Sequence, residues 1–391
     1  MRSARARAWV GIGGRIGYQR LPRVRTRMSE EVERIAWGTK PPGRAERERV
    51  GAALARGELV AIPTETVYGI AARADDPAAV ARLCELKRSD AARPLTWHVG
   101  ALSALEEFPR VSPMVRRLVE RYWPGPLTLV LPGVPRGLEA AAGGGWTGVR
   151  FPAQPSTAKL LRSLEFPVVA TSANLQGEPP LADADAVARA FGSRLAYVLD
   201  GGPPRLGEAS VVLKLGPGQF ELLRSGIIEL EQLRAVAGLK IGFVCTGNTC
   251  RSPMAEGLAR TAVARRLEVE PARLREFGFE FRSMGLFASA GAPASSHAVD
   301  VLAATEIDLS GHRSRNVLPE EIVRLDRVYA MTHRHLESLR LLLPPGKDRH
   351  CSLLDPSGSE ISDPMGGPRE DYERAAADIR RAIEARLEEW V

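Results

Sequence analysis

Residues 243–260, FVCTGNTCRSPMAEGLAR, constrain the fold more than any other part of this 391-residue chain. An apolar run ends at Cys245, and a loop of small and polar residues leads from it to Arg251 and a helical pattern. A strand, a tight loop and a helix N-terminus aim successive backbone N–H groups and the positive end of the helix dipole at one place. Such a loop binds anions and stabilises the thiolate form of a cysteine at its start.

The residues of this loop suit phosphoryl transfer. A thiolate at Cys245 can attack phosphorus, and the planar guanidinium of Arg251 matches two oxygens of a phosphoryl group. Gly247 and Asn248 tolerate the left-handed backbone that a tight anion loop needs. A structural metal clip is a poorer alternative, because the C-x4-C spacing lacks a second pair of ligands. The plainest alternative makes Cys245 a buried strand end and Arg251 a surface residue.

The sequence CTGNTCRSPMAE resembles the low-molecular-weight protein tyrosine phosphatase family over about residues 240–391, with a Rossmann-like parallel sheet. The resemblance makes Cys245 the nucleophile that forms a phosphocysteine, Arg251 the phosphate clamp and Ser252 a hydroxyl donor to the thiolate. The motif ISDPMGGPREDY supplies Asp363 as general acid, which protonates the leaving group and later activates water. No cofactor is implied. The supporting loop residues are Thr246, Gly247, Asn248, Thr249, Cys250 and Ser252.

Thr249 bears on the substrate. Within the family, the branch that acts on phosphoarginine carries threonine at this position, and tyrosine-directed members commonly carry a larger aliphatic residue. A hydroxyl can accept a hydrogen bond from a guanidinium, so we expect phosphoarginine ahead of phosphotyrosine; the alternative is that Thr249 only packs. Arsenate reduction is a minor alternative, because only Cys351 follows where related reductases have a closely spaced cysteine pair. Cys250 is either inert or a disulfide partner of Cys245 on oxidation.

The net charge of +7 belongs to the N-terminal tail. Residues 1–27 hold eight arginines and no acidic residue, so the remainder of the chain carries −1. This segment lacks periodicity, and we expect it to be disordered. Met28 is followed by SEEVERIAW, which is typical of a protein start, so we interpret the tail as an over-extended reading frame. An RNA-binding arm or a transit peptide is the alternative.

Length and composition favour two domains in a cytoplasmic protein. A chain of 391 residues has room for two cores. Four scattered cysteines do not make a disulfide framework, and neither a secretory signal nor an apolar run of about 18 residues is present, so we expect no membrane association.

The order of expected elements places the domain boundaries. An apolar strand and a helix beginning near Pro77 start an α/β pattern, and further strands are expected at 127–131, 166–174, 197–200 and 210–215. A charged helical segment leads to a second α/β pattern. We therefore predict a tail and lead-in at 1–44, a mixed-sheet domain at 45–228, a linker at 229–238 and a parallel-sheet domain at 239–391.

Several short motifs in the first half of the chain are weak when taken alone, but their order along the chain is specific. They include IPTETVYGIAARADDP, in which Thr64 and Thr66 leave the strand on one side, ELKRSDAARPLTWHVG, GVRFP, VVATSANLQGEPP and LLRSGII. Over about residues 46–228 this order resembles the threonylcarbamoyl-AMP synthase family, whose fold is a twisted mixed sheet. The resemblance implies adenylation of a threonine carbamate, made from L-threonine and bicarbonate or CO2, by ATP with Mg²⁺. That product serves the t6A modification of tRNA, so tRNA and t6A proteins are implied partners.

The resemblance also assigns residues to the two substrates. The threonine side comprises Thr66, His98, Arg150, Thr171 and Ser210; the ATP side comprises Lys87, Arg88, Arg93, Ser172, Asn174 and Arg224. Clustered cations suit a reaction whose charge develops on phosphate oxygens. Three positions depart from the family pattern. Ser89 replaces a cation, with Arg88 as a neighbouring substitute; Asp90 replaces a proline; Leu213 replaces an aspartate.

These patterns predict a bifunctional enzyme, a synthase joined to a phosphatase that acts on a phosphorylated protein. The alternative is a regulatory phosphatase whose N-terminal half only binds RNA or a nucleotide. A non-enzymatic scaffold is less consistent with the set of Cys245, Arg251 and Asp363.

Overall fold

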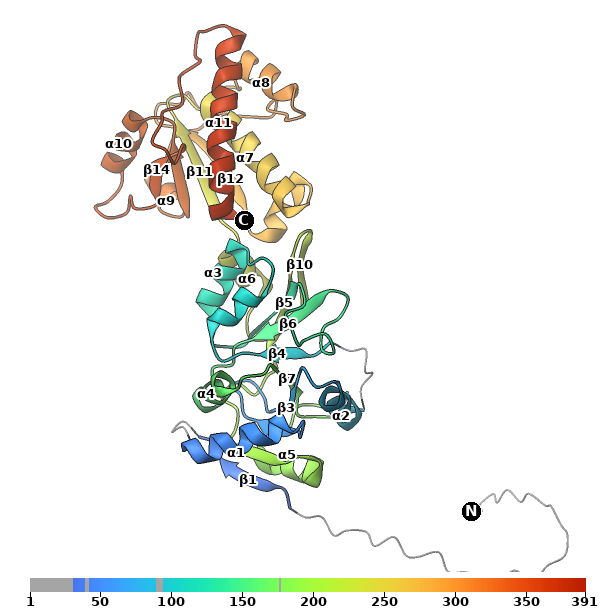
Figure 1. The fold of residues 1–391 in the computed structure, drawn as a ribbon. Coiled ribbons are helices and arrows are strands. Elements are labelled where there is room, and N and C mark those ends of the chain that lie inside the picture. The colour runs from blue at the N-terminus through green and yellow to red at the C-terminus, as the bar shows by residue number, and fades with distance from the viewer. Residues whose placement is uncertain (1–30, 39–41, 89–93, 176) are drawn as a thin grey trace, which may run out of the picture.

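The protein is described by a computed structural model covering residues 31–38, 42–88, 94–175 and 177–391. Two α/β bodies, one from each half of the chain, lie one above the other (Figure 1). The arginine-rich tail at 1–27 lies outside the described residues, as do Ser89, Asp90 and Arg93.

The first body is built on a mixed sheet of ten strands among the described residues, in the order β1-β8-β2-β3-β7-β4-β6-β5-β9-β10. Strand β4 lies near its middle, parallel to β6 and antiparallel to β7. The strands are β1 (Glu33–Ala36), β2 (Val60–Ile62), β3 (Gly69–Arg73), β4 (Thr96–His98), β5 (Leu127–Pro132), β6 (Trp146–Arg150), β7 (Val168–Ser172), β8 (Tyr197–Asp200), β9 (Val211–Gly216) and β10 (Gln219–Arg224).

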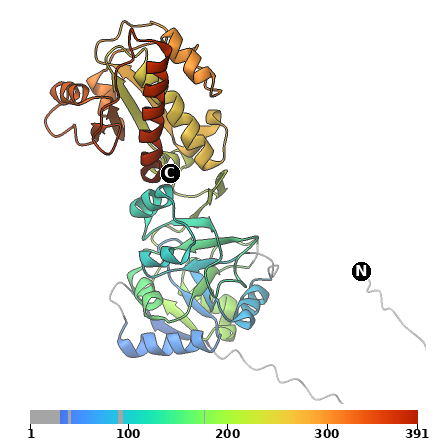
Figure 2. The ribbon, with the colours of Figure 1, turned by 45° about the horizontal axis from the view of Figure 1, so that its top comes forward.

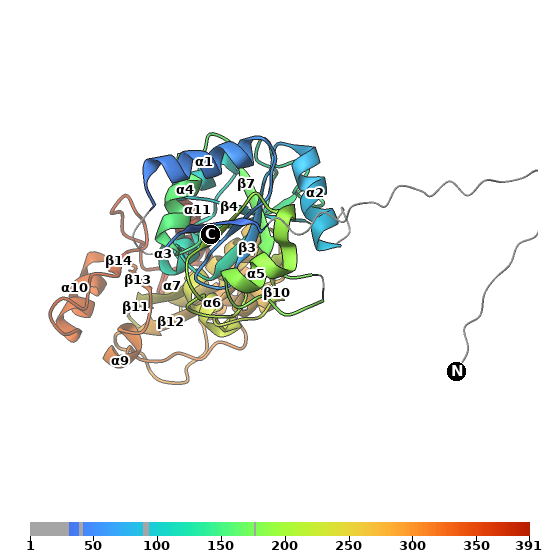
Figure 3. The same ribbon diagram turned by 90° about the horizontal axis from the view of Figure 1, so that it is seen from below.

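Helices cover both faces of this sheet. Helices α1 and α4 lie against one face and α2 and α5 against the other (Figure 3), and their apolar side chains form two separate clusters with the strands. Asp76 caps α2 and Pro77 opens it, which is a favoured start for a helix. The helices are α1 (Arg44–Ala55), α2 (Pro77–Lys87), η1 (Leu102–Glu107), α3 (Pro113–Tyr122), α4 (Pro155–Ser163), α5 (Ala184–Phe191) and η2 (Gly192–Arg194).

Strand β1 extends the first sheet beyond the predicted start of the domain at residue 45. It pairs in parallel with β8, from Glu33 opposite Tyr197 to Ala36 opposite Asp200. Only Ile35 of the four residues is buried, so the segment lacks the apolar run that marks the other strands. Its pairing partner lies more than 160 residues away in the sequence, and no local pattern could indicate it.

The second body has a four-stranded parallel sheet in the order β12-β11-β13-β14. Helices α7, α8 and α11 pack on one face, and α9 and α10 pack on the other. Its elements are β11 (Lys240–Cys245), α7 (Arg251–Leu267), η3 (Pro271–Phe277), β12 (Glu280–Gly285), α8 (Ser296–Ala303), α9 (Pro319–Ile322), β13 (Arg327–Ala330), α10 (His333–Leu342), β14 (Cys351–Leu353) and α11 (Arg369–Trp390).

The expected linker at 229–238 contains helix α6 (Leu230–Ala237), which packs between the bodies. Arg117 of α3 donates hydrogen bonds to the carbonyls of Ala237 and Trp390, the latter at 2.9 Å. Phe220 of β10 lies edge-on to Phe277, with ring centroids 5.8 Å apart. One apolar cluster therefore runs through the junction, which is narrow in both side views (Figure 2).

The expected elements that the structure describes are confirmed closely. Strands lie at β5, β7, β8 and β9, helix α2 begins at Pro77, and α7 begins at Arg251, where the loop was expected to lead into a helix. The fold is α/β in both halves, with a mixed sheet first and a parallel sheet second. Among the described helices, none combines the length and the hydropathy needed to cross a lipid bilayer.

Candidate active sites

The thiol of Cys245 lies at the carboxyl end of β11, buried beside the first turn of α7. Its Sγ is 3.0 Å from the Ser252 Oγ, and that hydroxyl also accepts a hydrogen bond of 3.0 Å from the Asn248 Nδ2. Ser252 is itself fully buried. The hydroxyl is thus held where it can donate to a thiolate, the position expected for it from the sequence.

The loop between strand and helix is braced from outside. Asn248 has a positive φ of 54°, its Oδ1 accepts from the Arg315 backbone N–H at 2.9 Å, and its carbonyl lies 2.7 Å from the His312 Nε2. Gly285 allows β12 to approach, because a Cβ there would lie 2.7 Å from the Thr246 carbonyl oxygen. These contacts hold the loop backbone from β12 and from residues 312–315.

Arg251 and Asp363 meet at this loop although 112 positions separate them. The Arg251 Nη2 donates to the Asp363 Oδ2 at 2.5 Å, and the Nη1 donates to the Ile361 carbonyl at 3.1 Å. The guanidinium is buried, whereas about half of the Asp363 side chain is exposed. The carboxyl group can therefore release the guanidinium, which is then free to bind phosphate, and turn toward the leaving group.

His335 is a neighbour of the loop that the sequence did not single out. Its Nε2 lies 2.9 Å from the Thr246 Oγ1, and its Nδ1 lies 2.9 Å from the Thr332 Oγ1. Burial and, next, the Arg251 charge lower its pKa to about 4, so the ring is neutral at pH 7. The segment AMTHRH held the signal, but only the fold selects His335 over His333.

Thr249 and Cys250 occupy the far end of the loop. The Cys250 Sγ lies 3.7 Å from the Tyr372 hydroxyl and 3.6 Å from the Thr249 Oγ1. Cys250 is buried and forms no disulfide, and Thr249 is half-buried. The Cys250 sulfur therefore lies between the hydroxyls of Thr249 and Tyr372 in these contacts.

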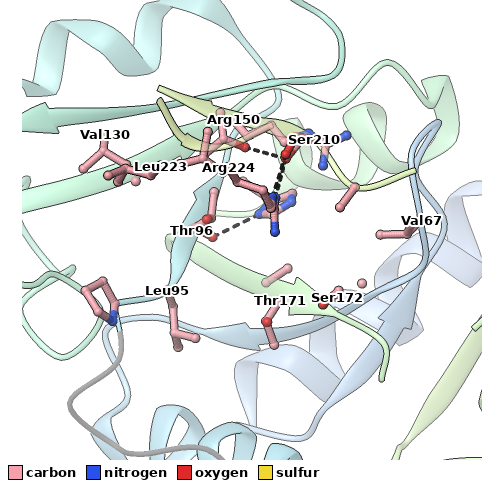
Figure 4. A pocket seen from close by; sticks show the side chains of 18 of the residues that line it. Val67, Leu95, Thr96, Val130, Arg150, Thr171, Ser172, Ser210, Leu223 and Arg224 are labelled. Atoms are coloured by element: carbon pink, nitrogen blue, oxygen red, sulfur yellow. Dashed lines mark hydrogen bonds between the residues drawn. The ribbon is translucent and has the colours of Figure 1, made fainter. Parts of the chain in front are cut away.

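A cavity of about 850 Å³ lies on the first sheet (Figure 4). Of the residues predicted for the synthase site, the cavity brings together Lys87, His98, Arg150, Thr171, Ser172, Asn174, Ser210 and Arg224. Thr66 and Arg88 do not line it: Thr66 is buried behind Arg150, and Arg88 ends α2 with a left-handed φ of 52°.

Arg150 forms a buried ion pair that was not predicted. Its Nη2 donates to the Glu65 Oε1 at 2.6 Å and to the Thr66 Oγ1 at 2.7 Å. The second Glu65 oxygen accepts from the Ala153 backbone N–H at 2.8 Å. Both side chains of the pair are about 95% buried. Glu65 therefore neutralises and orients a cation at the wall of the cavity.

Lys87 holds the turn that follows β7. Its Nζ donates to the carbonyls of Ser172 and Asn174, and to the Asn174 Oδ1 at 2.8 Å. The Ser172 hydroxyl donates to the same Oδ1 at 2.5 Å. Lys87 is thus a positioning residue for Ser172 and Asn174 as well as a charge at the cavity wall.

Ser210 connects the two predicted halves of this site. Its hydroxyl lies 2.8 Å from the Thr128 Oγ1 and accepts from the Arg224 Nη2 at 2.9 Å, and its carbonyl accepts from the Arg224 Nε at 2.8 Å. Arg224 points into the cavity over Ser210 (Figure 4). A ligand group at Ser210 would therefore adjoin the ATP-side cation.

His98 acts as a neutral ring. It lies in β4, buried opposite Arg150 of β6. Its Nδ1 donates to the Thr96 carbonyl at 3.0 Å. Burial and, next, the Arg150 charge lower its pKa to about 3. The neutral tautomer leaves Nε2 as a hydrogen-bond acceptor.

Leu213, which stands where the family pattern has an aspartate, is not part of the cavity wall. Leu213 is fully buried in the core, and its neighbours Val212 and Lys214 line the cavity, because side chains alternate along β9. Lys214, Trp146 and Glu221 line the cavity without having been predicted. The alternation in SVVLKL could have indicated Lys214.

The described residues include no group of three or more histidine, cysteine, aspartate or glutamate side chains that could hold a metal ion.

Family models match both halves of the chain. One described as "Telomere recombination", for Sua5, YciO and YrdC, matches residues 52–226, and one described as "Low molecular weight phosphotyrosine protein phosphatase" matches residues 240–391.

Individual relatives agree with this division. The "Threonylcarbamoyl-AMP synthase" of Bacillus subtilis is 39% identical over 193 residues, which are 49% of this chain and 56% of that protein. The "Putative threonylcarbamoyl-AMP synthase" of Mycobacterium tuberculosis is 34% identical, over 48% of this chain and 87% of that protein. The "Protein-arginine-phosphatase" of Geobacillus stearothermophilus is 39% identical over 38% of this chain and 94% of that protein.

The chain spans little more than half of the B. subtilis synthase but nearly all of the G. stearothermophilus phosphatase. Its first half therefore belongs to the threonylcarbamoyl-AMP synthase family, and its second half belongs to the low-molecular-weight protein phosphatase family.

Proposed function

We propose that the chain is a bifunctional enzyme that makes L-threonylcarbamoyl-AMP and dephosphorylates proteins at phosphoarginine. The observation that carries the first activity is the convergence of eight predicted residues on one cavity. The observation that carries the second is the meeting of Cys245, Ser252, Arg251 and Asp363 at one loop.

In the synthase reaction, the amine of L-threonine and CO2 from bicarbonate form a carbamate, and a carbamate oxygen attacks the α-phosphorus of ATP. The bond from that phosphorus to the bridging oxygen breaks, and pyrophosphate leaves. Arg150 offers its guanidinium to the threonine carboxylate, and Arg224 offers charge to the phosphates. Mg²⁺ enters with ATP as part of the substrate.

The synthase proposal is tested by pyrophosphate release from ATP. Release should require both L-threonine and bicarbonate, and omission of either should reduce it to background, because the carbamate is the attacking group. Arg224→Gln should lower the rate, whereas the exposed Lys159→Gln should not change it. Folded protein with no threonine-dependent release would leave the first half as a binding module for a nucleotide or RNA.

In the phosphatase reaction, the Cys245 sulfur attacks phosphorus, the phosphorus–nitrogen bond of phosphoarginine breaks, and Asp363 gives its proton to the leaving guanidine. Water then attacks the phosphocysteine, Asp363 takes a proton from it, and phosphate leaves with the thiolate restored. Arg251 and the loop N–H groups stabilise the charge on the phosphoryl oxygens in both steps. No cofactor takes part.

Thr249 is proposed as the selector of phosphoarginine. Thr249→Ile should lower kcat/KM for phosphoarginine by about tenfold or more, because the guanidinium loses a hydrogen-bond acceptor. The value for phosphotyrosine should stay the same or rise. Thr249→Ser keeps the hydroxyl and serves as the control. If all three proteins discriminate equally, Thr249 only packs.

A further inference from the structure

Lys214 is a charged residue of the cavity to which neither half of the proposed reaction gives a role. It lies in β9 opposite Val130 of β5 and opposite Glu221 of β10, and all three side chains line the cavity. The neighbours Leu213 and Leu215 are buried in the core on the other face. Strand alternation therefore fixes the Lys214 side chain on the cavity side.

The Lys214 ammonium group is held by an aromatic ring. Its Nζ lies 4.3 Å from the centroid of the Trp146 ring, a cation–π contact. It makes no hydrogen bond or ion pair of standard geometry with any described residue, not even with Glu221 across the strand pair. A cation–π contact is weaker than a charge-assisted hydrogen bond to phosphate, so an anion can draw this group away from the ring.

The other cations that line the described part of the cavity already have protein acceptors. Arg150 is neutralised by Glu65, Lys87 donates to the turn at Ser172 and Asn174, and Arg224 donates twice to Ser210. Binding an anion at these groups competes with existing hydrogen bonds. Lys214 offers its charge without that competition.

Lys214 lies on the same face of β9 as Val212, which pairs with Arg224 of β10, the cation expected to bind ATP. Its partner Trp146 packs on Gly216, where a Cβ would lie 2.8 Å from the ring, so the ring has a fixed place. Lys214 and Arg224 therefore line the same part of the cavity wall.

We propose that Lys214 binds the β- and γ-phosphates of ATP and the pyrophosphate that leaves. This inference rests on the proposed synthase function. When the bond between the α-phosphorus and the bridging oxygen breaks, the electron pair goes to the pyrophosphate, and a nearby cation stabilises the added negative charge. The sequence has Ser89 where the family motif has a cation, and Lys214 supplies a positive charge on the sheet wall of the cavity.

The test uses the full chain and compares Lys214→Gln with Lys214→Arg and with the exposed control Lys159→Gln. Calorimetry measures Kd for inorganic pyrophosphate, ATP and AMP. Lys214→Gln should raise Kd for pyrophosphate and ATP by about tenfold or more and leave Kd for AMP within about twofold, because AMP lacks the phosphates at issue. Lys214→Arg should keep most of the affinity. Steady-state kinetics should show a raised KM for ATP with an unchanged KM for threonine.

Unchanged pyrophosphate affinity in Lys214→Gln overturns the proposal, and so does an equal loss of AMP affinity, which would indicate a structural role. A wild-type protein that binds no pyrophosphate overturns it as well. If the wild type binds pyrophosphate through Lys214 but releases none in a threonine-dependent manner, the synthase function fails and the phosphate-binding role of Lys214 stands.

Discussion

Cys245→Ser should reduce phosphatase turnover by more than about 10⁴-fold on both phosphoarginine and phosphotyrosine, because losses of this size follow removal of an attacking nucleophile. The serine hydroxyl is far less ionised than a thiol at neutral pH, and the surrounding loop stays intact. Phosphate release by the purified full chain measures the effect. The substrate should still bind, since Arg251 and the loop N–H groups remain.

Cys250→Ser is the matched control, because it changes a second buried thiol of the same loop that does not reach the Ser252 hydroxyl. Its turnover should stay within about tenfold of the wild type. Pyrophosphate release by the first half should be the same in all three proteins. If Cys245→Ser, like Cys250→Ser, kept turnover within about tenfold of the wild type, Cys245 would not be the nucleophile.

The phosphatase loop could be predicted residue by residue because its geometry is local. Cys245, Asn248, Arg251 and Ser252 lie within eight positions, and the strand-loop-helix turn alone brings them together. Asp363 was predicted through its motif. His335 was not, since its contact with Thr246 depends on how α10 packs against the sheet.

The cavity of the first half depends on strand order, which the sequence does not state. Strand β9 lies between β5 and β10, so Lys214 reaches the same wall as residues some 80 positions earlier. The resemblance assigned Thr66 to the threonine side. In the structure β2 ends at Ile62, and the Thr66 hydroxyl accepts a hydrogen bond from Arg150. Glu65 was overlooked because a buried acid is recognisable only through its partner.

The second large effect is expected at the buried pair of Glu65 and Arg150. Glu65→Gln should destabilise the first half by about 3 kcal/mol, because it leaves the guanidinium buried without a counter-charge. Arg150→Met should cost a similar amount by leaving the carboxylate unpaired, and it should also abolish threonine-dependent pyrophosphate release. Urea unfolding followed by tryptophan fluorescence measures the change, since four of the five described tryptophans lie in the first half.

The double variant Glu65→Gln/Arg150→Met separates pairing from packing. If each single variant suffers mainly from an unpaired charge, removing both charges should leave the double variant no less stable than either single one, a strongly non-additive result. Additive losses would mean instead that the two side chains contribute independently, through contacts such as Thr66 and Ala153. The double variant should remain inactive even when stable, because Arg150 is needed by the ligand and Glu65 is needed only to hold Arg150 in place.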